Sequence, residues 1–369
     1  MALRYLLLAA GLAGCMAGSP EGESDRPGRV LLTPAPDDDG VTRVLVYHDM
    51  EGLAGQDDWR TFLFPWTEYY EEGRKLLTAD MNAVIDGLYA GGADEVHVVD
   101  AHGSTNPEPD LLLDQLDSRA SMVYRDEPFG PYMDLTEPGV YDAIAVVAMH
   151  AKTGSVGFAS HTFTIGMEVI LNGMSITETE TIGYSWGRVG VPVIFASGDD
   201  KLGKDLETMP WIEYVITKQA TSASTAELRP VDEVRRELQQ AAKRAMENWD
   251  EAKAMRVTEP VTTALRVVPP STLSMLKGVP GLDYTDNQVT FEAADYAAAI
   301  EGAQALMNVA QTAWSDLMFE VVAARPDGDE LQKQWLEALV VRWFDYESGR
   351  WTPPSRPERE PGRKYHGST

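Results

Sequence analysis

Short apolar runs alternate with longer segments of helical periodicity along the first part of the chain. The apolar runs have the length of buried β-strands and occupy residues 44–47, 95–99, 143–148, 191–195 and 214–216. The helical patterns cover residues 67–89, 177–188 and 201–207. This alternation predicts an α/β fold with a three-layer αβα core, in which helices cover both faces of a largely parallel sheet. Active sites in such folds gather at the carboxyl ends of the strands.

The pattern changes beyond residue 225 and predicts a second, smaller unit. We expect a main α/β domain over residues 41–225 and a smaller C-terminal α/β unit over residues 226–350. The patterns of the second unit are a charged helix over residues 231–248, strands near 264–268 and 289–291, and an Ala-rich helix from 293 to about 314.

The first residues have the composition of a bacterial export signal. An apolar run follows a single arginine, and the sequence LAGC that ends at Cys15 resembles a lipobox. We therefore expect residues 1–14 to be a lipoprotein signal peptide and Cys15 to be lipidated, with residues 15–40 as a flexible tether. The protein would then be exported and anchored to a membrane, facing the periplasm or the cell exterior. The alternative is an ordinary signal that is cleaved after Ala17.

Charge narrows the range of partners. The 369 residues include 58 acids and 31 Lys and Arg, for a formal net charge of −27. Because a chain with this negative charge would repel the phosphate backbone of a nucleic acid, we expect no nucleic-acid partner. Residues 351–369 combine proline, glycine and charge with little to bury, which predicts a disordered tail. His366 lies in that tail and is not a candidate for the site.

Two carboxylates follow the first apolar run in the sequence VYHDMEG. Asp49 and Glu51 are two positions apart, so in an extended segment both side chains point to the same side. Two like charges held so close favour a cation between them. The alternative is a solvated turn with Gly52 as its hinge.

The next two runs also end in residues that bind metals. Asp100 and His102 follow the run at 95–99, and His150 follows the run at 143–148. Because neighbouring parallel strands end at the same edge of a sheet, these side chains and the first pair can meet at one metal site.

Two further candidates lie beyond the third run. His161, in the loop sequence GFASHTF, is a polar residue among apolar ones and is suited to act as an acid, base or nucleophile. Glu178 and Glu180 lie in the first turn of a helix that Thr177 can cap, where acids are stabilised by the helix dipole. Helix capping alone accounts for both glutamates. One of them becomes a candidate metal ligand only if it lies close to the other candidate ligands.

Taken together and in order, these motifs resemble the D-aminopeptidase family, peptidase family M55. The resemblance is carried by VYHDMEGLAG, VHVVDAHG, AMHAKTG, SHTF eleven residues later, NGMSITETE and VPVIFASGDD. It implies two zinc ions held by Asp49, Glu51, His102, His150 and Glu178, with Asp100 behind His102 and His161 as the catalytic histidine. It also implies peptide substrates with an N-terminal D-residue and assembly into homo-oligomers. Tyr47 departs from the family pattern, which often has serine there, and is expected to fill space near the metals.

The prediction is a membrane-tethered dizinc aminopeptidase that hydrolyses the N-terminal residue of short peptides or amides through a metal-activated water. Carboxylate and imidazole ligands without thiolate suit hydrolytic zinc, although manganese or cobalt fits the same donors. The alternatives are another metal-dependent amidohydrolase and a non-catalytic peptide-binding lipoprotein of a transport system.

Overall fold

The computed structural model describes residues 29–34, 39–125, 129–352 and 364–367. Its largest sheet has seven strands in the order β10-β9-β8-β5-β2-β3-β4. All neighbours in this sheet are parallel except β9 and β10. The strands are β2 (Arg43–His48), β3 (Glu95–Asp100), β4 (Ser121–Met122), β5 (Ala143–Met149), β8 (Val193–Asp199), β9 (Glu213–Ser222) and β10 (Thr225–Leu228).

Alternate residues of each strand point to opposite faces of this sheet, and both faces are buried. Val44 and Val46 of β2 pack in one core with α1 (Thr67–Gly91) and α4 (Val231–Glu247). Leu45 and Tyr47 pack in another core with α2 (Glu178–Gly187). The short helix α3 (Asp200–Asp205) follows β8 directly. The central strands therefore read as continuous apolar runs, as expected for a covered parallel sheet.

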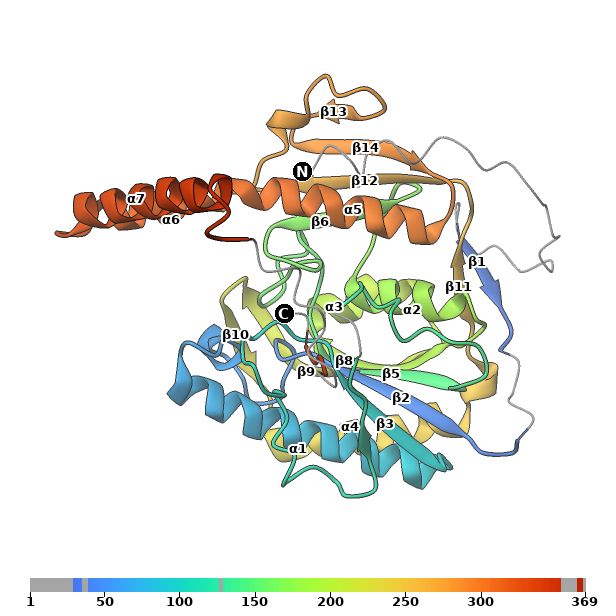
Figure 1. Cartoon of the computed structure of the whole chain (residues 1–369). Helices are drawn as coiled ribbons and strands as arrows, with labels where there is room; N and C mark the ends of the chain where they lie inside the picture. The colour runs from blue at the N-terminus through green and yellow to red at the C-terminus, as the bar shows by residue number, and fades with distance from the viewer. Residues whose placement is uncertain (1–28, 35–38, 126–128, 353–363, 368–369) are drawn as a thin grey trace.

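A second sheet has five antiparallel strands in the order β13-β14-β12-β6-β7, and α5 (Tyr296–Ala310) packs on it. Figure 1 shows this sheet and α5 on the α2 side of the molecule. A small third sheet pairs β1 with β11. The strands are β1 (Arg29–Leu32), β6 (Met167–Leu171), β7 (Met174–Ser175), β11 (Ala254–Val257), β12 (Val261–Val267), β13 (Asp283–Thr285) and β14 (Gln288–Ala293).

The sheets divide the chain differently from the expected boundary at residue 225. β10 and α4, beyond that point, belong to the seven-stranded sheet and its covering layer. β6 and β7, before it, pair with β12 in the five-stranded sheet. Sequence periodicity reports which elements form, but not which sheet each strand joins.

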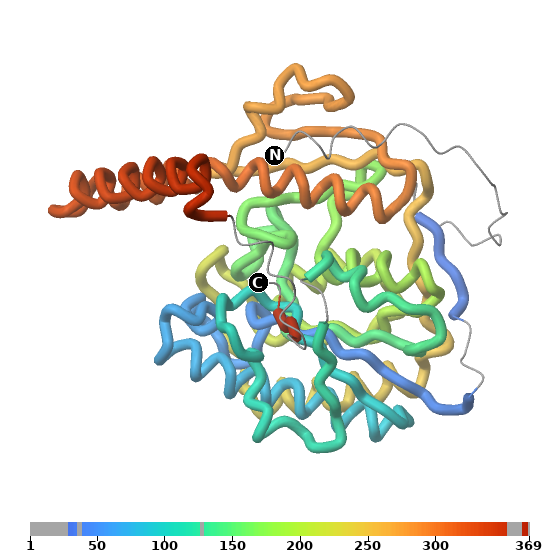
Figure 2. The backbone as a smooth tube through the Cα atoms, viewed as in Figure 1, coloured from blue at the N-terminus to red at the C-terminus, as the bar shows by residue number. Residues whose placement is uncertain are grey.

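Two helices extend beyond the body of the molecule. The expected Ala-rich helix ends at Ala310, and a 3-10 turn leads into α6 (Trp314–Ala323) and then α7 (Gly328–Glu347). Both project outward as an arm (Figures 1 and 2). The 3-10 turns of the described chain are Trp59–Phe62, Leu206–Thr208, Trp249–Glu251, Ser274–Leu276 and Gln311–Ala313. Exposed large apolar residues of the arm are Leu317, Met318, Val321, Trp335, Leu336, Leu339, Val340, Val341, Trp343, Phe344 and Tyr346.

Parts of both terminal segments are ordered where the sequence predicted flexibility. Residues 29–32 of the expected tether form β1, and the buried guanidinium of Arg29 donates to the carbonyl of Thr208. Residues 364–367 of the expected disordered tail pack against the body through main-chain hydrogen bonds. Both segments find backbone partners in distant strands and loops, which composition alone does not reveal. Cys15 and the expected signal peptide lie outside the described residues.

Among the described residues, the helices are too short or too polar for any of them to cross a membrane.

Candidate metal centre

The carboxyl ends of three adjacent strands bring the predicted ligands together. Asp49 and Glu51 follow β2, His102 follows β3 and His150 follows β5, and β2 lies between the other two strands. The turn after β2 is held against β5, because the amide of Asp49 donates to the carbonyl of Val147 at 2.9 Å.

Gly52 allows this close approach of turn and strand. Its amide donates to the carbonyl of Ala148 at 2.8 Å, and a Cβ atom on it would lie 2.2 Å from the carbonyl oxygen of Met149. A side chain at this position would therefore push the carboxylate turn away from β5.

A first group of ligand atoms comes from Asp49, Glu51 and His102. Nδ1 of His102 lies 2.7 Å from Oδ1 of Asp49 and 3.3 Å from Oε2 of Glu51. The other ring nitrogen, Nε2, donates to the carbonyl of Phe62 at 2.8 Å. That bond fixes the ring so that Nδ1 faces the two carboxylates, as is typical of a metal-binding histidine.

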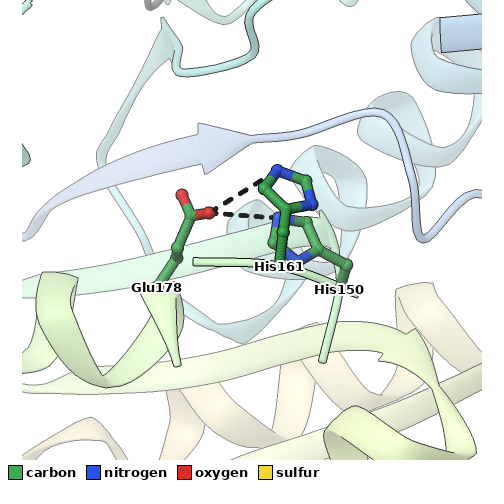
Figure 3. A group of neighbouring side chains, drawn as sticks. All are labelled: His150, His161 and Glu178. Carbon is green, nitrogen blue, oxygen red and sulfur yellow. Dashed lines mark ion pairs between the residues drawn. The ribbon is translucent and has the colours of Figure 1, made fainter. Parts of the chain in front are cut away.

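A second group comes from His150, His161 and Glu178. Nε2 of His150 lies 3.2 Å from Oε1 of Glu178, and Nε2 of His161 lies 3.9 Å from the same oxygen (Figure 3). The two imidazole rings stack with centroids 3.8 Å apart. Their Nδ1 atoms are bonded to the carbonyls of Ala151 and Ala159, so both Nε2 atoms present a lone pair on the side of Glu178.

Asp49 joins the two groups. Its Oδ1 faces His102, as described above, and its Oδ2 lies 3.3 Å from Nε2 of His150. One carboxylate thus has an oxygen directed at each group, which is the arrangement of a bridging ligand.

The site is buried and rich in negative charge. Asp49, Glu51 and Glu178 are 4%, 3% and 5% exposed. Within the described chain, the ion pairs of these carboxylates are formed with histidines. Although burial opposes charge on the imidazole, the carboxylates of Glu51 and Asp49 hold the pKa of His102 well above its usual range. Such a cluster favours a bound cation.

The donors fit zinc. They are carboxylate oxygens and imidazole nitrogens, and Nε2 of His150 is buried without a hydrogen-bond partner among the described residues. A divalent cation between the ligand atoms would satisfy this nitrogen and would neutralise the carboxylates.

The structure places Glu178, and not Glu180, beside His150. Thr177 caps α2 and forms a capping box with Glu180, whose carboxylate also accepts from Thr208. Glu178 instead accepts from the amide of Phe163 at 2.7 Å and from the hydroxyl of Tyr132. The two glutamates of one helical turn therefore have separate tasks.

Asp100 supports the backbone next to the ligands. Its Oδ1 accepts from the amide of His102 at 3.1 Å, and its Oδ2 accepts from the amide of Asp110 at 3.0 Å. This carboxylate fixes the turn that presents His102.

Two residues near the site are missing from the sequence prediction. Tyr132 is buried, and burial together with the Glu178 carboxylate holds its pKa well above the usual range, so its hydroxyl stays protonated as a donor. Lys218 is fully buried, and its Nζ donates to the carbonyl of Glu51 at 2.6 Å. Tyr132 lies in a loop with no recognisable motif, whereas a lysine within the apolar pattern of β9 was a readable signal.

Tyr47 does not reach the ligands. Its hydroxyl accepts from Nε1 of Trp186 at 3.0 Å, and its ring packs edge-on against that of Tyr132 with centroids 5.8 Å apart. It therefore fills space behind Tyr132.

Residues 42–305 match the profile of the D-aminopeptidase family, Peptidase_M55. The chain belongs to the D-aminopeptidase family. This membership confirms the resemblance seen in the sequence and the prediction of an M55-type peptidase. The matched residues include every ligand candidate described above, whereas α6, α7 and residues 364–367 lie outside the match.

Two members of the D-aminopeptidase family can be compared with this chain. A D-aminopeptidase of Bacillus subtilis (strain 168) is 28% identical over 210 residues, which are 56% of this chain and 74% of that protein. The solved structure of the Zn-dependent D-aminopeptidase DppA from Bacillus subtilis, described as a self-compartmentalizing protease, aligns with a TM-score of 0.65 at 22% identity. The alignment covers 73% of this chain and 98% of that chain. It confirms the predicted α/β fold with a largely parallel sheet.

Proposed function

We propose that the chain is a dizinc aminopeptidase that removes the N-terminal residue from short peptides, with a preference for D-residues. The observation that carries the proposal is the pair of ligand groups joined through Asp49. The proposed ligands are Asp49, Glu51, His102, His150 and Glu178, and these five exceed the three or four protein ligands that one zinc usually takes. The names of the two relatives support the zinc and the D-residue preference.

Each ligand group would hold one ion. Glu51 and His102 would bind the first, His150 and Glu178 the second, and Asp49 both. When bound, two zinc ions at such a site polarise a scissile carbonyl and lower the pKa of a water toward neutrality.

His161 is the proton carrier in this proposal. Its side chain is 17% exposed, whereas that of His150 is 1% exposed, so it is the imidazole that can reach a substrate. Burial and the neighbouring His150 lower the pKa of His161, so the ring is neutral at pH 7. With Nδ1–H fixed on the carbonyl of Ala159, Nε2 is free to accept a proton from the attacking water and to deliver it to the leaving amine.

Hydrolysis assays with matched substrates test the function. Zinc-loaded protein should hydrolyse D-aminoacyl amides faster than their L-enantiomers, and metal analysis should find about two zinc ions per chain. Turnover of other amides in place of aminoacyl amides would favour the amidohydrolase alternative. Peptide binding without turnover by zinc-loaded protein would favour the binding lipoprotein.

We further propose that the protein is exported and anchored through a lipidated Cys15. The motive is the LAGC sequence after an apolar run. Cys15→Ser should release the protein from the membrane fraction. Unchanged membrane partitioning of this variant would refute the anchor.

Homo-oligomerisation is also part of the proposal. It is supported by the description of the relative DppA as self-compartmentalizing and by the exposed apolar residues of the arm formed by α6 and α7. Light scattering after gel filtration would measure the mass of the assembly.

A further inference from the structure

A segment from the far end of the chain lies beside the metal centre. Tyr365 pairs with Arg125 as in an antiparallel sheet. The amide of Arg125 donates to the carbonyl of Tyr365 at 2.9 Å, and the amide of Tyr365 donates back at 2.8 Å. Arg125 follows β4, the edge strand of the seven-stranded sheet, where a peptide can add to the sheet.

The side chain of Arg125 connects this segment to the strand that carries His102. The residue is only 2% exposed, and its guanidinium forms an ion pair with Asp134. Its Nη1 donates to the carbonyl of Asp100 at 2.8 Å and to the carbonyl of Gly367 at 3.2 Å. One buried cation therefore binds both the base of the metal site and the segment.

Gly367 ends the described segment directly against a metal-ligand residue. It is buried, and a Cβ atom on it would lie 2.7 Å from the carbonyl oxygen of His102 and 3.7 Å from Oδ1 of Asp100. The preceding residue, His366, donates from Nε2 to the carbonyl of Pro107 at 2.7 Å. Figure 1 shows the segment, in red, at the carboxyl end of the seven-stranded sheet.

Most of these contacts do not depend on the sequence of the segment. Arg125 binds the amide and carbonyl of Tyr365 and the carbonyl of Gly367, which are main-chain groups that any peptide contains. Recognition through main-chain hydrogen bonds at a sheet edge is a common mode of peptide binding.

We propose that Arg125 forms a subsite for the main chain of a peptide, and that residues 364–367 of this chain occupy the subsite. The ligand class, a short peptide near the metals, rests on the proposed peptidase function. Occupation by the chain itself makes the segment a competitor of peptide substrates. Because the segment is tethered, it acts at an effective concentration of about millimolar.

Binding of a labelled peptide tests the subsite without relying on turnover. The probe is a peptide of residues 363–369 with fluorescein on its N-terminal amine, which blocks cleavage by an aminopeptidase. We compare zinc-loaded full chain with a variant that ends at residue 363. The variant should bind the probe, and the full chain should bind it about tenfold or more weakly. A probe with Tyr365→Pro, which lacks the amide that donates to Arg125, should not bind.

A pair of glycine variants tests the segment within the intact chain. Gly367→Val places a side chain against His102 and should displace the segment, whereas Gly349→Val meets open space. Both glycines have similar positive φ angles, 65° and 71°, so a side chain strains the backbone at both positions. Gly367→Val should bind the probe like the shortened chain, and Gly349→Val should behave like wild type.

Kinetics add a second readout. The shortened chain should show a lower KM for peptides with an unchanged kcat, and the unlabelled peptide should inhibit it competitively. Equal KM values for the shortened and full chains, or failure of the shortened chain to bind the probe, would overturn the subsite. A lower melting temperature with no change in probe binding would assign the segment a bracing role only and would also refute the proposal. If neither chain hydrolyses peptides, the proposed function fails, and binding of the labelled probe still decides the subsite.

Discussion

Oδ2 of Asp49 lies 3.3 Å from Nε2 of His150, although the two residues follow different strands. Since Oδ1 of the same carboxylate faces the other ligand group, removal of its charge should disturb both ions. Asp49→Asn keeps the shape of the side chain, and we expect it to lower the zinc content from about two per chain to well below one. Plasma emission spectrometry of dialysed protein measures this. Retention of one full equivalent would show that Asp49 serves a single ion.

Neighbouring glutamates of α2 provide a matched pair. Glu178→Gln should lower zinc content and activity, because Glu178 faces His150. Glu180→Gln should retain zinc, because Glu180 closes the capping box and accepts from Thr208. We expect Glu180→Gln to lower only the free energy of unfolding, by on the order of 1 kcal/mol. Equal zinc loss in both variants would contradict the separation of tasks.

His161→Ala separates proton transfer from metal binding. The imidazole is the most exposed of the site and is stacked on His150, so we expect the variant to keep its zinc and its melting temperature. Its kcat on a D-aminoacyl substrate should fall by about 10²- to 10⁴-fold. Loss of one zinc ion would instead identify His161 as a ligand, and full activity would refute the catalytic role.

Much of the candidate site can be read from the sequence, because its candidate ligands follow apolar runs at the ends of adjacent parallel strands. Asp49, His102 and His150 all obey this rule. The choice between Glu178 and Glu180 needed the family resemblance, since both lie in the first turn of α2. The fold class followed from the alternation of strands and helices. The division of the strands between the sheets could not be predicted in this way, because β6 pairs with β12, which lies far from it in the sequence.

The contacts made by loops and by the chain termini could not be predicted from the sequence. Tyr132 lies in a loop and has a φ of 55°, and no periodic pattern marks it. Residues 364–367 have the composition of a disordered tail, yet Arg125 supplies main-chain partners that are remote in sequence. Such pairings depend on where the two segments meet in space.

Asp110 provides a test based on pH. Burial, with the neighbouring Asp100 carboxylate, raises its pKa to about 7. An unfolded aspartate has a pKa of about 3.9, so between pH 4 and 7 the folded state holds the proton that the unfolded state releases. This group therefore lowers stability as the pH rises through that range.

Asp110→Asn removes the titration but keeps an oxygen to accept from Ser104 and Tyr70. The variant should be more stable than wild type at pH 8 by on the order of 1–4 kcal/mol, and the difference should vanish near pH 4. Denaturant unfolding at both pH values measures it. A constant difference across the pH range would show that Asp110 does not titrate in this way.

Lys218 holds the turn that carries Glu51. Its Nζ donates to the carbonyls of Glu51 and Gln56 at 2.6 and 3.1 Å and to Oε1 of Gln56 at 2.6 Å. Lys218→Met has a similar length but no donor, so it leaves these three buried oxygens without their partner. We expect a loss of stability of about 1–3 kcal/mol and zinc affinity about 10- to 100-fold weaker, because the ligand turn is no longer fixed. Competition with a zinc chelator measures the affinity.

The control is Lys204→Met, at an exposed position of α3, which should leave both the stability and the zinc affinity unchanged. If Lys218→Met destabilises the protein but binds zinc as tightly as wild type, Lys218 supports the fold and does not position Glu51.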